Sequence, residues 1–98
     1  MLNVKEKLNE VIEMQEELGN PFIAIHKPKA KNKIVEYESD TCAFDIVEDK
    51  LLFDFFEIEG FSVKLNNIVD VIIQKFKEMV LTTIKLRNGN SILIHEFI

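Results

Sequence analysis

The sequence contains a single cysteine, and long apolar stretches are missing from it. Cys42 has no partner for a disulfide within the chain, so we expect a reducing compartment, the cytoplasm. Unbroken apolar runs span only a few residues, far short of the roughly 20 that a membrane helix requires. The first residues lack the pattern of a secretion signal. We therefore expect a cytoplasmic protein with no membrane partner.

Residues suited to chemistry are also scarce. The three glycines are isolated from one another, which excludes a standard glycine-rich phosphate loop. The two histidines, His26 and His95, fall in no catalytic motif, and no ligand set has the spacing of a metal site. We therefore expect no enzyme, no cofactor and no metal. The alternative is a small-ligand-binding or metal-dependent enzymatic domain, with a pocket between helix and sheet that holds His26, Cys42 and His95 or nearby carboxylates.

What is present fits one small globular domain over residues 1–98. Apolar residues make up 47% of the chain and charged residues 30%, which is too apolar for a disordered tail. A chain of 98 residues is too short to divide into two domains. Lysine outnumbers arginine eleven to one, and residues with AT-rich codons are abundant. This composition leads to the hypothesis of a low-GC bacterium, or one of its mobile elements, as the source.

Negative charge is concentrated in the middle of the chain. The net charge is −5, but residues 34–60 hold nine carboxylates and one cation, whereas the flanking segments are slightly basic. Such a segment repels nucleic acid and attracts basic partners. We therefore expect binding to a basic protein surface and no direct nucleic-acid binding. The carboxylates expected to bind the partner are Glu36, Glu38, Asp45, Asp54, Glu57 and Glu59.

A helix over residues 4–18 is the best-defined expected element. Asn3 and Glu6 have the spacing of a capping box at its start. Apolar residues then recur along one stripe at helical spacing, and Gly19 and Pro21 supply stop signals. Because the stripe is too apolar to remain in water, the helix is expected to pack on the rest of the domain.

Alternating apolar residues predict several short strands before residue 66. A two-residue turn at Glu48–Asp49 would pair Phe44 with Phe53 and create a coherent core face. The opposite face mixes carboxylates with apolar side chains, so we expect the helix over 4–18 to cover part of it. Flanking prolines favour an edge position for the first strand. The expected extended segments are 22–26, 34–38, 41–47, 51–58 and 61–65.

The remaining third of the chain gives one ambiguous and one clear pattern. Apolar residues after Asn67 match a helical stripe, so we expect a second helix over 67–79. Read as strands instead, residues 61–71 resemble the alternating pattern of small meandering barrels of the pleckstrin-homology type, a resemblance that carries no functional motif. Asn88-Gly89 is a strong hairpin signal between the alternating segments 81–87 and 91–97.

These features together predict an α+β fold. An N-terminal helix packs on a mainly antiparallel sheet, with a second helix near 67–79 and a C-terminal β-hairpin. The expected function is a small non-catalytic protein-binding module, such as an inhibitor or accessory protein of a bacterial mobile element, which docks its acidic surface on a basic partner. A homodimer formed by edge-to-edge pairing of the C-terminal strand is a further hypothesis.

Overall fold

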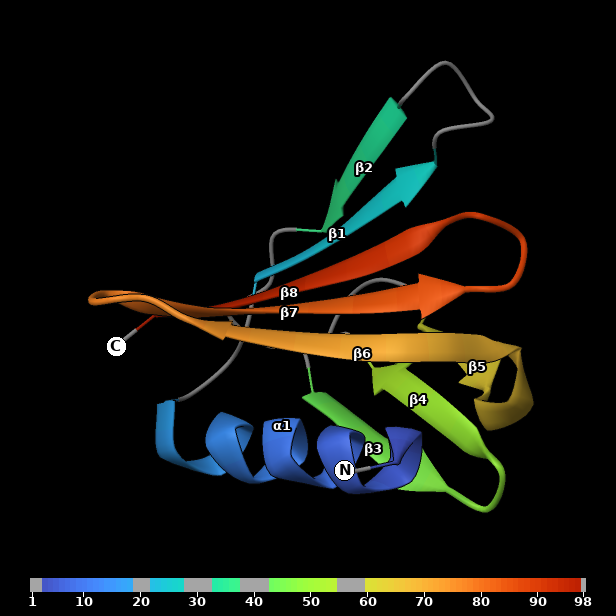
Figure 1. The fold of residues 1–98 in the computed structure, drawn as a ribbon, viewed down its shortest axis with the longest axis horizontal. Helices are drawn as coiled ribbons and strands as arrows, with labels where there is room; N and C mark the ends of the chain where they lie inside the picture. Colours follow the sequence, from blue (N-terminus) through green and yellow to red (C-terminus); the bar gives the residue numbers. More distant parts are fainter. Residues whose placement is uncertain (1–2, 19–21, 28–32, 38–42, 55–59, 98) are drawn as a thin grey trace.

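The computed structural model describes residues 3–18, 22–27, 33–37, 43–54 and 60–97. Among these residues it has one α-helix and two antiparallel sheets, which confirms the α+β fold class (Figure 1). The elements in chain order are α1 (Val4–Leu18), β1 (Phe22–Lys27), β2 (Lys33–Tyr37), β3 (Ala43–Val47), β4 (Lys50–Asp54), β5 (Phe61–Lys64), the 3-10 helix η2 (Leu65–Asn67), β6 (Ile68–Lys75), β7 (Met79–Leu86) and β8 (Ser91–Phe97).

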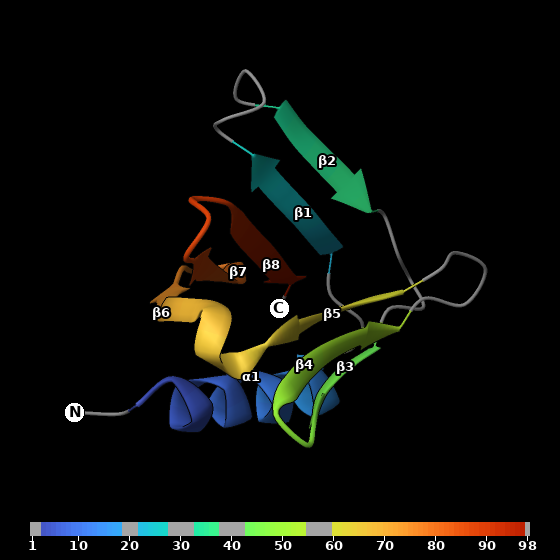
Figure 2. The same cartoon turned by 90° about the vertical axis from the view of Figure 1, so that its right-hand side faces the viewer.

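The two sheets and the helix enclose one core. Strands β2-β1-β8-β7-β6 form a five-stranded sheet, and β3-β4-β5 form a small sheet that faces it. Helix α1 lies along β6 and β3, at one open side between the sheets (Figures 1 and 2). The buried apolar side chains come from all three parts: Leu8, Val11, Ile23, Phe44, Leu51, Phe53, Ile68, Val71, Ile84, Ile92 and Ile94.

Helix α1 spans residues 4–18 as predicted. The amide of Glu6 donates to Oδ1 of Asn3 at 2.9 Å, and Nδ2 of Asn3 donates to Oε1 of Glu6 at 3.1 Å. The expected capping pair therefore forms, although Glu6 returns to the side chain of Asn3 and not to its backbone. Leu8 and Val11 of the apolar stripe are fully buried. Gly19 and Pro21, the expected stop signals, lie outside the described residues.

Gln15 of α1 closes the free edge of β3. Its Nε2 donates to the carbonyl oxygen of Phe44 at 3.0 Å, and its Oε1 accepts from the amide of Phe44 at 2.9 Å. The side-chain amide thereby replaces the neighbouring strand that an edge strand lacks. The expectation that the helix covers the outer face of β3 and β4 is wrong, since Val47 and Leu52 are 49% and 41% exposed there. The apolar stripe of α1 packs into the core between the sheets instead.

Replacing Gln15 by alanine removes both hydrogen bonds to Phe44. We expect the free energy of unfolding to fall by about 1–3 kcal/mol, because the backbone groups of Phe44 lose their partners at a partly buried edge. Urea denaturation measures the change. The control is Glu16→Ala on the exposed side of the same helix, which should change stability by less than about 0.5 kcal/mol. Equal losses in the two variants would show that the edge bonds contribute nothing.

The small sheet has the predicted register. Phe44 lies opposite Phe53 across the β3–β4 hairpin, and Glu48 at the two-residue turn adopts a positive φ of 57°. The ring of Phe53 stacks between Phe44, at 5.8 Å between centroids, and Phe61 of β5, at 4.7 Å. The parts of the expected strands at 41–42 and 55–58 lie outside the described residues. Within the described part, the aromatic stack is the centre of the small sheet.

Residues 68–75 form strand β6, so the expected second helix over 67–79 is wrong. The register with β7 shifts between Ile68 and Asp70, which leaves Val69 as an extra residue in a β-bulge. Val69 is 55% exposed, whereas Ile68 and Val71 are buried. The bulge therefore puts the inward residues three positions apart, a spacing that imitates a helical stripe.

Strands β7 and β8 form the predicted C-terminal hairpin, with a positive φ of 93° at Gly89. Strand β8 lies between β1 and β7, so its backbone is already paired on both sides and edge-to-edge dimerisation through it is wrong. Strand β1 lies between β2 and β8, so its expected edge position is also wrong. Pro21 and Pro28 lie outside the strand in the sequence, so every residue of β1 keeps the backbone amide that it needs for pairing.

Candidate functional site

Two of the predicted partner-binding carboxylates share the outer face of the small sheet. Asp45 lies opposite Leu52, and Asp54 lies opposite Ala43 in the same ladder. Side chains alternate along a strand, so Asp45, Leu52 and Asp54 project from one side. The two aspartates occupy diagonal positions, which are about 7–8 Å apart in such a ladder. All three side chains are exposed, and the structure places both carboxylates beside Leu52. Lys50 projects from the same face and is the other diagonal neighbour of Asp45.

The structure does not place the other four predicted carboxylates on this face. The backbone of Glu36 lies in β2, at the edge of the five-stranded sheet. Figure 2 shows β2 well apart from the β3–β4 hairpin. Glu38, Glu57 and Glu59 lie outside the described residues. The acidic surface that can be traced therefore consists of Asp45 and Asp54.

Neither Asp45 nor Asp54 forms an ion pair with a described residue. The amide of Ile46 donates to Oδ1 of Asp45 at 2.7 Å, which orients that carboxylate without neutralising it. Among the described residues, the ion pairs join α1 to β6: Lys7 to Asp70 at 3.3 Å and Lys75 to Glu10 at 3.8 Å. The two carboxylates therefore carry negative charge that no described residue pairs, on a face that also holds Lys50 and Lys64.

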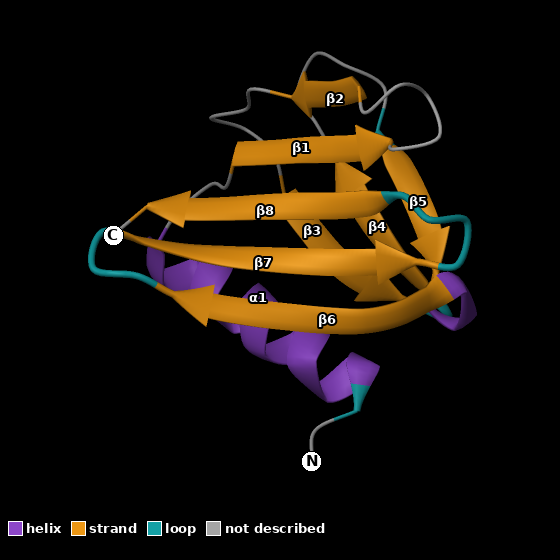
Figure 3. Ribbon diagram, turned by 45° about the horizontal axis from the view of Figure 1, so that its top comes forward, coloured by secondary structure: helices purple, strands orange, loops and turns teal. Residues whose placement is uncertain are grey.

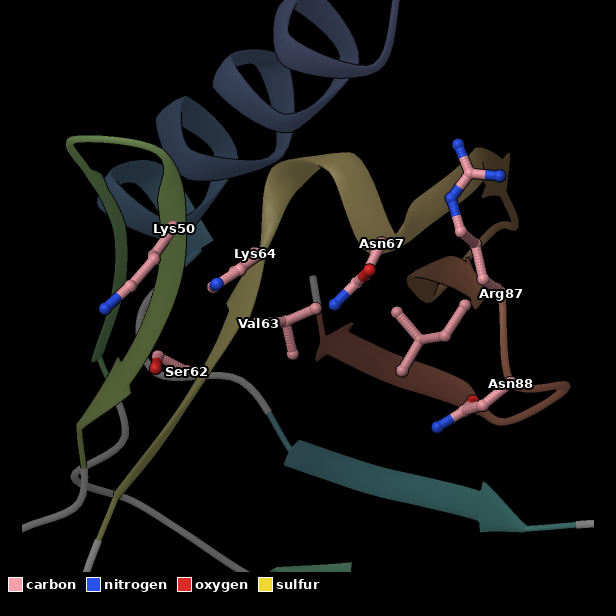
Figure 4. Close-up of a pocket in the computed structure, with 8 residues that line it drawn as sticks. Lys50, Ser62, Val63, Lys64, Asn67, Arg87 and Asn88 are labelled. Atoms are coloured by element: carbon pink, nitrogen blue, oxygen red, sulfur yellow. The ribbon is translucent and has the colours of Figure 1, made fainter.

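The end of the small sheet away from Asp54 is basic. Lys50 of β4 lies directly opposite Lys64 of β5, and Arg87 follows β7 at the start of the β7–β8 turn. The three cations border an open cleft of about 530 Å³. Figure 4 shows the lysines on one side of this cleft, Arg87 and Asn88 on the other, and Asn67 between them. Sequence reasoning missed the cleft because its cations are distant in the chain and Lys50 lies within the acidic segment.

The described residues do not assemble the alternative site of His26, Cys42 and His95. His26 lies opposite Ser91 and His95 opposite Phe22 in the β1–β8 ladder, which separates the histidines by four positions, about 13 Å. Cys42 lies outside the described residues. Within the described ranges, no three His, Cys, Asp or Glu side chains converge as a metal-binding group.

Glu96 is a buried carboxyl group that was not among the predicted site residues. Its side chain is 1% exposed on the inner face of β8, and neither carboxyl oxygen has a hydrogen-bond partner among the described residues. Burial raises the pKa of Glu96 to about 7. The hydroxyl of Thr82 on the adjacent strand is also buried without a described partner. Alternation in β8 could have revealed this position, because every second residue from Ile92 points inward.

The outer face of the five-stranded sheet is covered by none of the described helices and strands (Figure 3). Half-buried apolar side chains lie on this outer face at paired positions of neighbouring strands. They include Phe22 and Leu81, which both flank His95, and Leu93 and Ile72, which both flank Thr83. Phe97, at the end of β8, is 61% exposed. Among the described side chains, Lys85 of β7 adds an exposed charge to this face.

The described part of the chain has no helix that is long and apolar enough to cross a membrane. Comparison of the chain with known protein families, with curated proteins and with solved structures finds no match in any of the three. Function is therefore argued from the surfaces of this molecule.

Proposed function

We propose that this protein is a small non-catalytic binding module that docks the outer face of its small sheet on a basic protein surface. The observation that carries the proposal is the exposed group of Asp45, Asp54 and Leu52, whose two carboxylates form no ion pair with a described residue although Lys50 and Lys64 lie on the same face. An inhibitor or accessory protein of a bacterial mobile element would have this kind of role. The abundance of residues with AT-rich codons supports a low-GC bacterium or one of its mobile elements as the source.

The mixture of charge and apolar area on this face suits protein recognition. Protein interfaces combine an apolar centre with a polar rim, and Leu52 and Val47 supply exposed apolar area beside the carboxylates. Charge complementarity mainly raises the rate of encounter and selects the partner, while burial of the apolar side chains slows dissociation. The partner expected from this chemistry has lysines or arginines arranged around a shallow apolar patch.

The double variant Asp45→Asn/Asp54→Asn tests the proposal on a partner captured from the native host. We expect it to bind that partner about twofold to thirtyfold more weakly, since each exposed ion pair contributes about 0.2–1 kcal/mol. The loss should appear mainly in the association rate, and the dependence of that rate on salt should become weaker. Surface-based kinetics at two salt concentrations measure both quantities.

The matched control is Glu13→Gln/Glu17→Gln, which removes the same charge from the exposed side of α1. If this control weakens binding as much as the double aspartate variant does, net charge alone explains the effect. If neither variant changes the affinity or the salt dependence, the acidic face takes no part in binding and the proposal is wrong.

A further inference from the structure

We propose that the basic cleft, bordered by Lys50, Lys64 and Arg87, binds the phosphate group of a small phosphorylated molecule. Lys50, Ser62 and Lys64 project from the same face of the small sheet as Asp45 and Asp54 but toward the end away from Asp54, so the cleft adjoins the proposed protein-binding face. It is lined by eight residues, none of them acidic: Lys50, Ser62, Val63, Lys64, Asn67, Leu86, Arg87 and Asn88.

The pairing of Lys50 with Lys64 is the first argument for an anion. The two residues are direct partners in the β4–β5 ladder, and both side chains are exposed. Like charges directly opposite one another destabilise an antiparallel pair. Neither lysine forms an ion pair with a described residue; the ion pairs found there involve Lys7 and Lys75. A bound anion between the two ammonium groups would convert this repulsion into attraction.

The position of Arg87 is the second argument. Its Nε donates to the carbonyl oxygen of Asn66 at 2.7 Å, and its backbone amide donates to the carbonyl oxygen of Asn67 at 2.9 Å. These two bonds hold the arginine at the rim of the cleft, and its terminal nitrogens keep no described partner. A guanidinium group with both terminal nitrogens available is suited to bidentate bonding with phosphate oxygens, and less entropy is lost when it is already held.

The lining favours a phosphorylated small molecule over free phosphate. Ser62, Asn67 and Asn88 add neutral hydrogen-bonding groups, while Val63 and Leu86 add apolar side chains to the lining. The volume of about 530 Å³ lies in the range of small-molecule sites and exceeds what a phosphate ion fills. A substituent on the phosphate would occupy the remaining space and contact Val63 and Leu86.

The overall charge disfavours a nucleic acid in the same cleft. A short anion experiences the field of the nearby cations, because charges beyond about 8–10 Å are screened at physiological salt. A long polyanion would extend past the cleft onto a chain with a net charge of −5, including the exposed carboxylates of Asp45 and Asp54. The cations that border the cleft therefore favour a compact ligand.

NMR titration of the full chain with pyrophosphate at low salt tests the proposal. We expect saturable amide shifts that centre on Ser62, Lys64 and Arg87. The variant Lys50→Gln/Lys64→Gln should bind about tenfold or more weakly, because two charged contacts to phosphate oxygens are lost. Its melting temperature should be unchanged or higher, since the repulsion between the lysines is removed. A weaker complex of a folded variant would thus assign the site.

The charge-matched control is Lys5→Gln/Lys77→Gln, whose lysines are exposed and lie outside the cleft. Equal weakening in the two double variants would show that net charge, and not the cleft, attracts the anion. Absence of saturation by pyrophosphate would overturn the proposal. The proposal would also be overturned if a single-stranded oligonucleotide or anionic lipid vesicles shifted the same amide signals while pyrophosphate had no effect.

The variant Arg87→Lys provides an independent reading. It keeps the charge but loses the planar fork, so several-fold weaker pyrophosphate binding with the same set of shifted amides is expected. Unchanged affinity in this variant would contradict the assigned role of Arg87. The variant Asp45→Asn/Asp54→Asn should retain pyrophosphate binding, so the anion site and the proposed protein-binding face can fail separately.

Discussion

Replacement of Phe53 by alanine is expected to lower the free energy of unfolding by about 3–5 kcal/mol. The side chain is fully buried, and its ring stacks on Phe61 at 4.7 Å and on Phe44 at 5.8 Å. Its removal leaves a cavity among three strands whose hydrogen bonds prevent them from closing over it. Small domains have a total stability of about 5–15 kcal/mol, so this variant is expected to lie close to the limit of folding.

The adjacent residue offers the control for that experiment. Leu52 belongs to the same strand but points to the outer face, where it is 41% exposed. Leu52→Ala should therefore lower the free energy of unfolding by less than about 1 kcal/mol, since much of the Leu52 side chain is already in contact with water in the folded protein. Urea denaturation followed by circular dichroism measures both variants. Similar losses at the two positions would contradict the inward and outward assignment of β4.

Elements that depend on neighbouring residues were predictable from the sequence. Helix α1 has its cap, stripe and stop signals within its own segment, and its observed span, Val4–Leu18, agrees with the prediction. The two hairpins likewise have their turn residues next to their strands, so the pairing of Phe44 with Phe53 followed from the turn at residues 48–49. Local geometry was sufficient in each case.

Elements that depend on distant pairing were not predictable in the same way. The order β2-β1-β8 joins the two ends of the chain, and no local pattern in β1 distinguishes an edge position from an interior one. The bulge at Val69 is set by the register with β7, so residues 67–79 considered alone fitted a helix. The side of the small sheet that α1 covers depended on Gln15 and Phe44, two residues from separate segments.

The same distinction applies to the surfaces. Asp45 and Asp54 belong to one hairpin, so their shared face followed from alternation and was predicted. The basic cleft unites β4, β5 and the β7–β8 turn, and the acidic character of residues 34–60 concealed the role of Lys50. Glu96 was detectable, because it continues the inward series of Ile92 and Ile94, but a carboxyl group is rarely assigned to a core position.

The stability of the protein is expected to fall as the pH rises above about 5, because of Glu96. Burial raises its pKa from 4.5 to about 7, and an unfolded chain restores the ordinary value. Below about pH 4.5 the carboxyl group is protonated in both states and adds no pH dependence. Above that, the unfolded state releases its proton first, and by about pH 8 the folded state has lost up to about 3 kcal/mol relative to acidic conditions.

A second carboxylate acts in a different pH range and with the opposite sign. The backbone amide of Val71 and the side chain of Lys7 hydrogen-bond to Asp70 and lower its pKa from 3.8. Its contribution is present above the ordinary pKa and is lost as the pH falls below it. The fall in stability between about pH 5 and pH 8 is therefore expected to report on Glu96 and not on Asp70.

The variant Glu96→Gln isolates this effect. At pH 8 it should be more stable than the parent protein by about 1–3 kcal/mol, because a neutral amide avoids the burial of a charge. At pH 5 the two proteins should be nearly equal in stability, because the amide and the protonated carboxyl group both leave buried polar atoms unpaired. Urea denaturation at intervals between pH 5 and pH 8 measures the slope. The control Glu78→Gln changes an exposed residue in the β6–β7 turn and should retain the slope of the parent. If Glu96→Gln also retains that slope, the carboxyl group of Glu96 does not titrate with a raised pKa in the folded protein.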